Sequence, residues 1–442
     1  MDHLLEKATR QHTKDHNSRL VLRTIYDRGE VSRADLARLT QLTRTTISEV
    51  VVELIERGLV EEIGHGSVAV GRTPMMLSVV DDSRHVVAVS VSNDEIHGAL
   101  VNLRGSLRHE LRLPLPSREG ESALKHQPEL APEATESSES SSRKAESLPS
   151  VAAAADYASG VLATIYRVID ELTRSAERPL LGIGINTPGL IDTTSGTVLR
   201  TVNFGWEDLP LGGLLHQRYR LPVSVANDSQ TLALARYMFG QAPNTPNLVL
   251  IKVGRGIGAG IVLGGHLFSG DGYGAGEIGH MVVVENGVLC KCGNRGCLET
   301  VASSAVIVAQ ARALAAADPT SALHSRASSA EALTIAELAA AAEAGDEALG
   351  AIIAEAGRYL AIAVANIVSV LNIRQIVITG RVAPLGDLLG DAIRSELARR
   401  ALPALVRGTR VEVASVGPDA PLIGAIAPLL TAELGLVRLQ RR

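Results

Sequence analysis

The three cysteines of this 442-residue chain lie close together, at Cys290, Cys292 and Cys297, and His280 precedes them. Three thiolates and one imidazole make a complete set of ligands for a tetrahedral zinc ion, and the two glycines between Cys292 and Cys297 allow a tight turn around it. Because four protein ligands leave no open coordination position, we expect one structural zinc per chain. Two alternatives are buried free thiols beside an unrelated histidine and a transient redox pair. The complete clustering favours zinc.

The chain is long enough, at 442 residues, to form two or three domains. Aromatic residues make up 2% of the sequence, so we expect aliphatic cores. With 43 Lys and Arg against 48 Asp and Glu, the net charge is -5, and any nucleic-acid surface must therefore be local. The first 20 residues lack an apolar signal run, and the longest apolar stretch, residues 361–373, is too short to cross a membrane. We expect a cytoplasmic protein with no membrane partner.

Residues 18–80 are predicted to form three short helices and a two-stranded hairpin. Ser32 followed by Asp35 is typical of the start of a helix, and the next helix lies within TRTTISEVVVELIERG. The segment LVEEIGHGSVAVGRTPMMLSV then predicts two strands around a glycine-rich tip. This order of elements is that of a winged helix-turn-helix, and we assign residues 1–80 to such a domain.

In this arrangement the third helix enters the major groove of DNA. The residues expected to contact an operator are Thr43, Arg44, Thr45, Thr46 and Ser48, at the start of that helix, and Arg72 in the wing. His65 is a weaker candidate. Residues 1–50 carry nine basic and seven acidic residues, a net charge of only +2, so we expect a homodimer or homotetramer to be needed for affinity. The alternative is a three-helix packing module with solvated polar faces.

Residues 81–442 are predicted to form a second, larger domain. Residues 81–113 are typical of a strand meander, and residues 114–150, rich in Ser, Glu, Pro and Ala, of a disordered low-complexity insert. From residue 151 helices and strands alternate, which predicts an α/β core. Residues 311–346 are Ala-rich and predict a helical excursion, and a long buried helix is expected near residues 347–371.

Several motifs resemble those of the ROK family of repressors and sugar kinases: GRTP, GIGINTPGLID, ANDSQTLALARYMFG, GRGIGAGIVLGG, GAGEIGH and CKCGNRGCLE. The resemblance covers about residues 18–113 and 151–435. It implies an actin-like ATPase (ribonuclease H-like) fold of two lobes with a zinc loop. By position, it also implies that the sugar-binding residues are Asn227, Asp228, Glu277, His280 and Glu299.

The chemistry of these residues agrees with a ligand rich in hydroxyl groups, since carboxylates accept and an amide both donates and accepts hydrogen bonds. His280 could bind zinc through one ring nitrogen and sugar through the other, so that the metal sets its tautomer and orientation. The alternative for Glu277 and Glu299 is that they are solvated surface carboxylates.

The resemblance places Asp228 at the position of the family's catalytic base, yet the first phosphate-binding turn departs from the family pattern. Ser90 replaces its acid, Ser92 and Asn93 replace its two glycines, and Asp94 replaces its threonine. Side chains then occupy the space of the phosphates, and repulsion between unit charges 4 Å apart is about 4 kcal/mol at an effective dielectric of about 20. We therefore expect no catalytic residue, with Asp228 a vestigial base.

Two more turns depart from the family pattern. Arg255 stands in the second phosphate turn, where the family usually has threonine, and TGR at residues 379–381 replaces a glycine run. Arg255 could contact a phosphate on the ligand or pair with a surface acid; both interpretations stay open at this point.

The sequence thus predicts a DNA-binding transcriptional regulator, most simply a repressor, whose effector is a sugar or sugar phosphate that it does not phosphorylate. One alternative is an ATP-dependent sugar kinase with a fused DNA-binding domain. Another is a regulator that senses a partner protein while its sugar pocket stays vacant.

Overall fold

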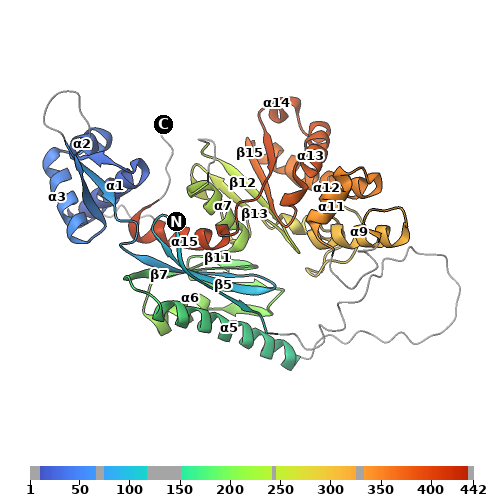
Figure 1. Cartoon of the computed structure of the whole chain (residues 1–442), viewed down its shortest axis with the longest axis horizontal. Helices are drawn as coiled ribbons and strands as arrows, with labels where there is room; N and C mark the ends of the chain where they lie inside the picture. Colours follow the sequence, from blue (N-terminus) through green and yellow to red (C-terminus); the bar gives the residue numbers. More distant parts are fainter. Residues whose placement is uncertain (1–9, 66–73, 117–150, 241–244, 325–332, 437–442) are drawn as a thin grey trace.

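The computed structural model describes residues 10–65, 74–116, 151–240, 245–324 and 333–436. Within these ranges the chain forms a small N-terminal head and two lobes, each built on a five-stranded sheet (Figure 1). The predicted α/β fold of two lobes behind a winged helix-turn-helix is confirmed. Most of the predicted disordered insert lies outside the described residues. Its expected first residue, Pro114, still pairs with Glu95 as part of a strand, so that boundary was placed too early.

The head is the predicted set of three helices and a hairpin. Its elements are α1 (Arg10–Arg28), β1 (Val31–Ser32), α2 (Arg33–Thr40), α3 (Arg44–Glu56), β2 (Val60–His65) and β3 (Met75–Val79). Ser32 caps α2 by accepting a hydrogen bond from the backbone N–H of Asp35, as the sequence predicted. Strands β2 and β3 are antiparallel, while the wing tip between them, residues 66–73, lies outside the described residues.

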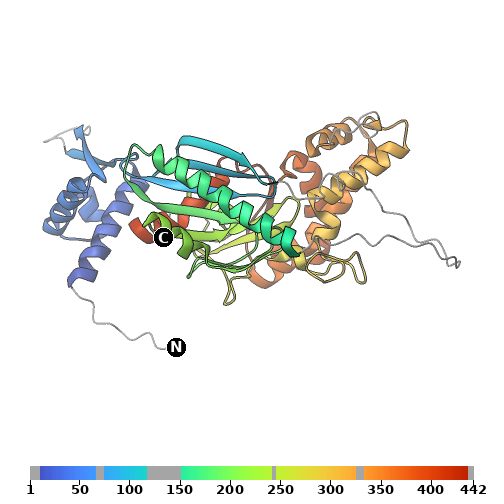
Figure 2. The same cartoon turned by 90° about the horizontal axis from the view of Figure 1, so that it is seen from below.

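The first lobe is a mixed sheet in the strand order β11-β7-β4-β5-β6. These strands are β4 (His85–Val91), β5 (Glu95–Asn102), β6 (Leu107–Pro114), β7 (Leu180–Thr187) and β11 (Val223–Asn227). Helices α5 (Val151–Arg174) and α6 (Leu211–Tyr219) belong to this lobe, and α5 crosses one face of the sheet (Figure 2). A smaller sheet follows β7 and contains β8 (Leu190–Asp192), β9 (Thr197–Thr201) and β10 (Trp206–Leu209).

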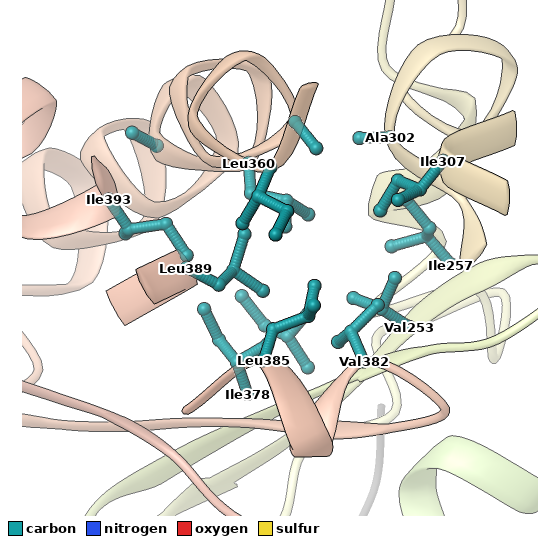
Figure 3. Packing of buried hydrophobic residues seen from close by; sticks show 14 of the residues in the cluster. Val253, Ile257, Ala302, Ile307, Leu360, Ile378, Val382, Leu385, Leu389 and Ile393 are labelled. Carbon is teal, nitrogen blue, oxygen red and sulfur yellow. The ribbon is translucent and has the colours of Figure 1, made fainter. Parts of the chain in front are cut away.

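The second lobe has the strand order β14-β13-β12-β15-β16. These are β12 (Leu248–Val253), β13 (Ile257–Leu263), β14 (His266–Leu267), β15 (Gln375–Gly380) and β16 (Arg410–Val413). Its helices are α8 (Glu299–Ala302), α9 (Ser304–Ala317), α11 (Ile335–Glu343), α12 (Glu347–Leu371), α13 (Gly386–Arg400) and α14 (Pro403–Val406). Aliphatic side chains from the sheet and these helices interdigitate in one core, as the scarcity of aromatic residues predicted (Figure 3).

Helix α12 is the one helix of the described residues long and apolar enough to cross a membrane by length and composition. Half of its most apolar window is buried inside the protein, and Leu360 and Val364 are fully inaccessible to solvent. It packs along α13 and against α9. In this fold α12 is a core helix of the second lobe.

Two helices join the lobes: α7 (Asp228–Met238) packs on β12 and β13, and α15 (Ala420–Leu434) packs on β4, β7 and α7. Glycines make this close approach possible. A Cβ atom at Gly184 would lie 2.2 Å from the carbonyl oxygen of Ala425, and one at Gly424 would lie 2.3 Å from that of Thr231. Any side chain at these positions would push α15 away from its neighbours.

We expect Gly184→Ala to lower the free energy of unfolding by about 1–3 kcal/mol, because the added methyl group meets backbone that only a shift of α15 can move. Gly350→Ala is the matched control: this glycine lies in α12, and its Cβ would meet nothing within 4 Å. The control should be neutral or gain up to about 1 kcal/mol. Urea denaturation measures both, and equal effects would contradict the packing argument.

Candidate functional site

A cavity of about 600 Å³ lies between the two lobes. Its lining includes all five residues predicted to bind sugar: Asn227, Asp228, Glu277, His280 and Glu299. They come from the end of β11, the start of α7, the segment after β14 and the start of α8, so the fold brings together residues up to 72 positions apart (299 minus 227). The volume is that of an ordinary small-molecule site.

Asn227 and Asp228 stand where β11 ends and α7 begins. The side-chain oxygen of Asn227 caps α7 by accepting hydrogen bonds from the backbone N–H groups of Ser229, at 2.8 Å, and Gln230, at 3.2 Å. Its amide nitrogen donates to the carbonyl oxygen of Gly189 at 2.9 Å. These bonds fix the start of the helix, and with it the direction of the Asp228 carboxylate.

Asp228 has a partner that the sequence analysis missed. The ammonium group of Lys252, on β12, forms an ion pair with its carboxylate, and both residues line the cavity. The signal was present in the sequence: Lys252 is the one charged residue in the apolar strand LVLIKV. The pair connects the start of α7 with β12 of the second lobe.

Glu277, His280 and Glu299 form the opposite wall. The His280 Nε2 atom lies 3.9 Å from the carboxylate of Glu277, and its Nδ1 atom lies 3.8 Å from that of Glu299. Burial raises the pKa of Glu277; the positive charge of His280 lowers it, and the charges of Asp228 and Glu299 raise it further. The wall presents both acceptors and donors to a ligand.

The four predicted metal ligands lie beside this wall. One ligand atom from each of His280, Cys290, Cys292 and Cys297 lies within 4.8 Å of the other three. The Cys290 sulfur is 3.7 Å from His280 Nδ1, and the Cys292 and Cys297 sulfurs are 3.6 Å apart. Tetrahedral zinc with bonds of about 2.3 Å to sulfur requires ligand separations of about 3.8 Å, so the cluster fits such an ion.

The backbone of this loop supports the same arrangement. Gly293 and Gly296 have φ angles of +99° and +73°, and a Cβ atom at Gly296 would lie 1.7 Å from the carbonyl oxygen of Val284. Burial raises the pKa of the Cys290 and Cys297 thiols, so two of the three thiolates need a nearby cation to form at neutral pH. The predicted role of both glycines in folding the loop is confirmed by their backbone conformation.

The first phosphate turn, between β4 and β5, is closed on itself. The Ser92 hydroxyl accepts hydrogen bonds from the backbone N–H groups of Asp94, at 3.3 Å, and Glu95, at 3.1 Å. It also donates to the carbonyl oxygen of Glu95 at 2.9 Å. Ser90 is buried and donates to Asn186. The backbone N–H groups of Asp94 and Glu95 are thus occupied within the turn.

The two interpretations of Arg255 are distinguished by its contacts. Its guanidinium lies 2.8 Å from the carboxylate of Asp94, so it pairs with an acid of the same protein. Arg255 also lines the cavity, together with Asn93 of the same turn as Asp94.

The candidate DNA surface is the start of α3. Thr43 caps this helix by accepting a hydrogen bond from the backbone N–H of Thr46 at 3.2 Å. Four of the predicted DNA contacts are exposed here, namely Thr43, Arg44, Thr45 and Ser48, whereas Thr46 is half-buried. The opposite face of α3 packs into the head through Ile47 and Leu54, both fully buried. Arg72 lies outside the described residues.

The head is joined to the first lobe by a side-chain cluster that the sequence analysis did not identify. Arg104 stacks on the ring of Tyr26 with its guanidinium carbon 3.9 Å from the ring centroid, donates to the Tyr26 carbonyl oxygen and pairs with Asp81 at 3.0 Å. The Tyr26 hydroxyl donates to the carbonyl oxygen of Leu103, and burial raises the pKa of Tyr26 to about 12. Helix α1 is thereby held to the lobe that carries half of the cavity.

A winged-helix head on a two-lobed fold with an interlobe cavity and a Cys3His loop defines a class of proteins that combine a DNA-binding module with a sugar-kinase-like scaffold. The chain belongs to the ROK family, whose model matches residues 136–432, and a MarR family model matches residues 17–67.

Similar proteins include repressors and kinases. The xylose repressor of Caldicellulosiruptor bescii is 29% identical over 95% of this chain and 97% of its own length. A ROK family transcriptional regulator described as a homologue of the Escherichia coli Mlc protein has a crystal structure with a TM-score of 0.75 and 26% identity, covering 96% of this chain and 98% of that chain. A ROK family glucokinase from Streptomyces griseus, in complex with glucose and AMPPNP, has a TM-score of 0.61 and 26% identity, covering 77% of this chain and 97% of that chain.

Proposed function

We propose that the protein is a DNA-binding transcriptional repressor whose effector is a sugar or sugar phosphate bound between the lobes. The observation that carries the proposal is the contrast within one cleft: five groups suited to hydroxyls line the cavity, while the adjacent phosphate turn is closed on itself. The matched repressors align over almost the whole chain, head included. We assign the head to residues 1–80 and the sensor to residues 81–442.

Three features argue against phosphoryl transfer. A general base must accept a proton from the sugar hydroxyl, and Asp228 is already paired with Lys252. A kinase also needs backbone N–H groups aimed at the phosphates, and in the first turn those of Asp94 and Glu95 are bound to the Ser92 hydroxyl. Finally, the Asp94 carboxylate already pairs with Arg255 and Arg381, so these two cations are less available to a nucleotide phosphate. We therefore assign sensing without turnover and treat a sugar kinase with a DNA-binding head as the rival.

Glu277→Gln should weaken sugar binding by about tenfold to a hundredfold, because it replaces a charged hydrogen-bond acceptor. Glu285→Gln, an exposed acid on the zinc loop, is the control and should bind like the unmodified protein. A thermal-shift screen of sugars and sugar phosphates, with and without ATP, identifies the ligand, and calorimetry gives the affinities. Sugar-dependent ADP release at ordinary enzyme rates would overturn the sensor assignment. A panel without any binder would favour a partner-protein signal.

We further propose that Thr43, Arg44, Thr45, Thr46, Ser48 and Arg72 contact operator DNA. The exposed start of α3 offers hydroxyl groups and a guanidinium to base edges and phosphates. The small local charge suggests that a homodimer or homotetramer supplies affinity, with recognition helices about 34–36 Å apart or a multiple of that distance. A repressor acts where the DNA is, which in a bacterial cell is the cytoplasm.

Arg44→Ala should reduce the affinity for the operator by about tenfold or more, since a good side-chain contact to a base contributes about 1–3 kcal/mol. Arg358→Ala removes the same charge from α12 and should leave operator binding unchanged. Fluorescence anisotropy at several salt concentrations measures both. If Arg44→Ala and Arg72→Ala both bind like the unmodified protein, the assigned surface is wrong.

We propose that the Cys3His cluster holds one structural zinc ion. When bound, zinc would supply positive charge to three thiolates and fix the ring of His280, leaving its Nε2 atom toward Glu277 and the cavity. The loop would then position the sugar-contacting face of His280. This role requires no open coordination position.

Elemental analysis should find about one zinc per chain, and the Cys290→Ser, Cys292→Ser double variant should lose it and unfold at a lower temperature. Lys291→Gln lies between the two cysteines without being a ligand, and this control should keep the metal. An unchanged zinc content in the double variant would show that these cysteines do not bind the metal.

A further inference from the structure

Three charged residues from different parts of the chain meet at the edge of the cavity. Asp94 lies in the turn between β4 and β5, in the first lobe, whereas Arg255 lies between β12 and β13 and Arg381 directly follows β15, both in the second lobe. One carboxylate oxygen of Asp94 is 2.8 Å from Arg255 Nη2, and the other accepts a hydrogen bond from Arg381 Nη2. The cluster therefore connects the two lobes directly.

The second lobe is built to present both guanidinium groups to the same point. Strands β12 and β15 are parallel neighbours, so the residues that follow them emerge side by side. Gly380 adopts a φ angle of +94°, with Val253 so close that a Cβ atom would lie 2.6 Å from its carbonyl oxygen. Arg381 then donates its backbone N–H to that oxygen at 2.9 Å. This turn directs Arg381 toward Asp94.

The arrangement is that of an oxyanion held by two arginines, one oxygen to each. All three residues stand in turns whose sequences depart from the nucleotide-binding pattern of the family. We propose that the Asp94 carboxylate is a built-in anion that takes the place of a nucleotide phosphate between Arg255 and Arg381 and clasps the two lobes together. This inference rests on the proposed sensor function: the clasp would let the sugar site close without a nucleotide.

The clasp is weak enough to open. Asp94, Arg255 and Arg381 have 41%, 51% and 56% of their side chains exposed, and ion pairs at such sites are screened by water and salt. Exposed pairs shift a two-state equilibrium by about twofold to fivefold each. A cluster of this strength biases the cleft toward closure without locking it, which suits an equilibrium that a ligand must move.

The first test is calorimetry of the full chain with inorganic pyrophosphate as the probe. Asp94→Asn leaves two unpaired guanidinium groups at one point, so this variant should bind pyrophosphate at least tenfold more tightly than the unmodified protein. The gain should disappear in the triple variant that adds Arg255→Gln and Arg381→Gln. Asp391→Asn is the matched control: it also removes one acid paired with an arginine, Arg394, on the distant helix α13. It should gain nothing.

The second test is hydrogen exchange of the cleft segment 251–258 in the absence of any ligand. Asp94→Asn should accelerate exchange several-fold at low salt, and the difference should shrink at high salt because the lost pairs are screened. Asp391→Asn should leave this segment unchanged.

No gain in pyrophosphate affinity for Asp94→Asn, or an equal gain for Asp391→Asn, would overturn the proposal, as would exchange that Asp94→Asn leaves unaltered. Neither test uses sugar. If no sugar binds the unmodified protein, the sensor assignment fails. The pyrophosphate and hydrogen-exchange measurements still show whether Asp94 holds the two lobes together.

Discussion

The close packing of α15 against β7 and α7, which Gly184 and Gly424 permit, is the constraint on which the rest of the structure depends. Helix α7 begins at Asp228, in the wall of the cavity, and α15 lies against it and against the first sheet. At these two points backbone packs directly on backbone. A displacement of the start of α7 would therefore meet α15 with little room for adjustment at these contacts.

The far end of α15 reaches the DNA-binding head. Arg19 of α1 donates to the carbonyl oxygen of Ala432 at 3.0 Å, and Leu430 and Leu434 belong to the same hydrophobic cluster as the core of the head. The stacking of Arg104 on Tyr26 holds α1 to the first sheet at a second point. The head is thus packed against the first lobe. In the proposed dimer, a rotation of the lobes would change the distance between the two heads. A sugar could drive this change only through a difference in its affinity for the two arrangements.

The sequence predicted best what depends on local pattern. Alternating apolar strands, caps such as Ser32 and the crowded cysteines each carry their own signal within a few residues, and these features are present as expected. The pairing of distant charged residues carries no such signal: the apolar strand marks Lys252 as unusual but does not identify Asp228 as its partner. Asp94 and Arg381 are 287 positions apart, and their meeting depends on the packing of two lobes. For the same reason the sequence left two possible partners for Arg255, a ligand phosphate or an acid of the protein. It also did not predict the contact between Tyr26 and Arg104. The early boundary at Pro114 has another cause, since proline is tolerated at the edge of a sheet.

Several charged groups of the cleft already have partners within the protein, which is the physical basis of the proposed difference from a kinase. A kinase leaves N–H groups and cations unpaired so that nucleotide phosphates and their metal ions can complete them. Here Lys252 forms an ion pair with Asp228, and the Ser92 hydroxyl accepts a hydrogen bond from a backbone N–H of its own turn. Asp94 forms ion pairs with Arg255 and Arg381. The groups left to face a ligand are those suited to hydroxyls, among them Asn227, Glu277 and His280. In the proposed sensor no chemical step follows binding, so the binding energy could instead favour one arrangement of α7 and α15.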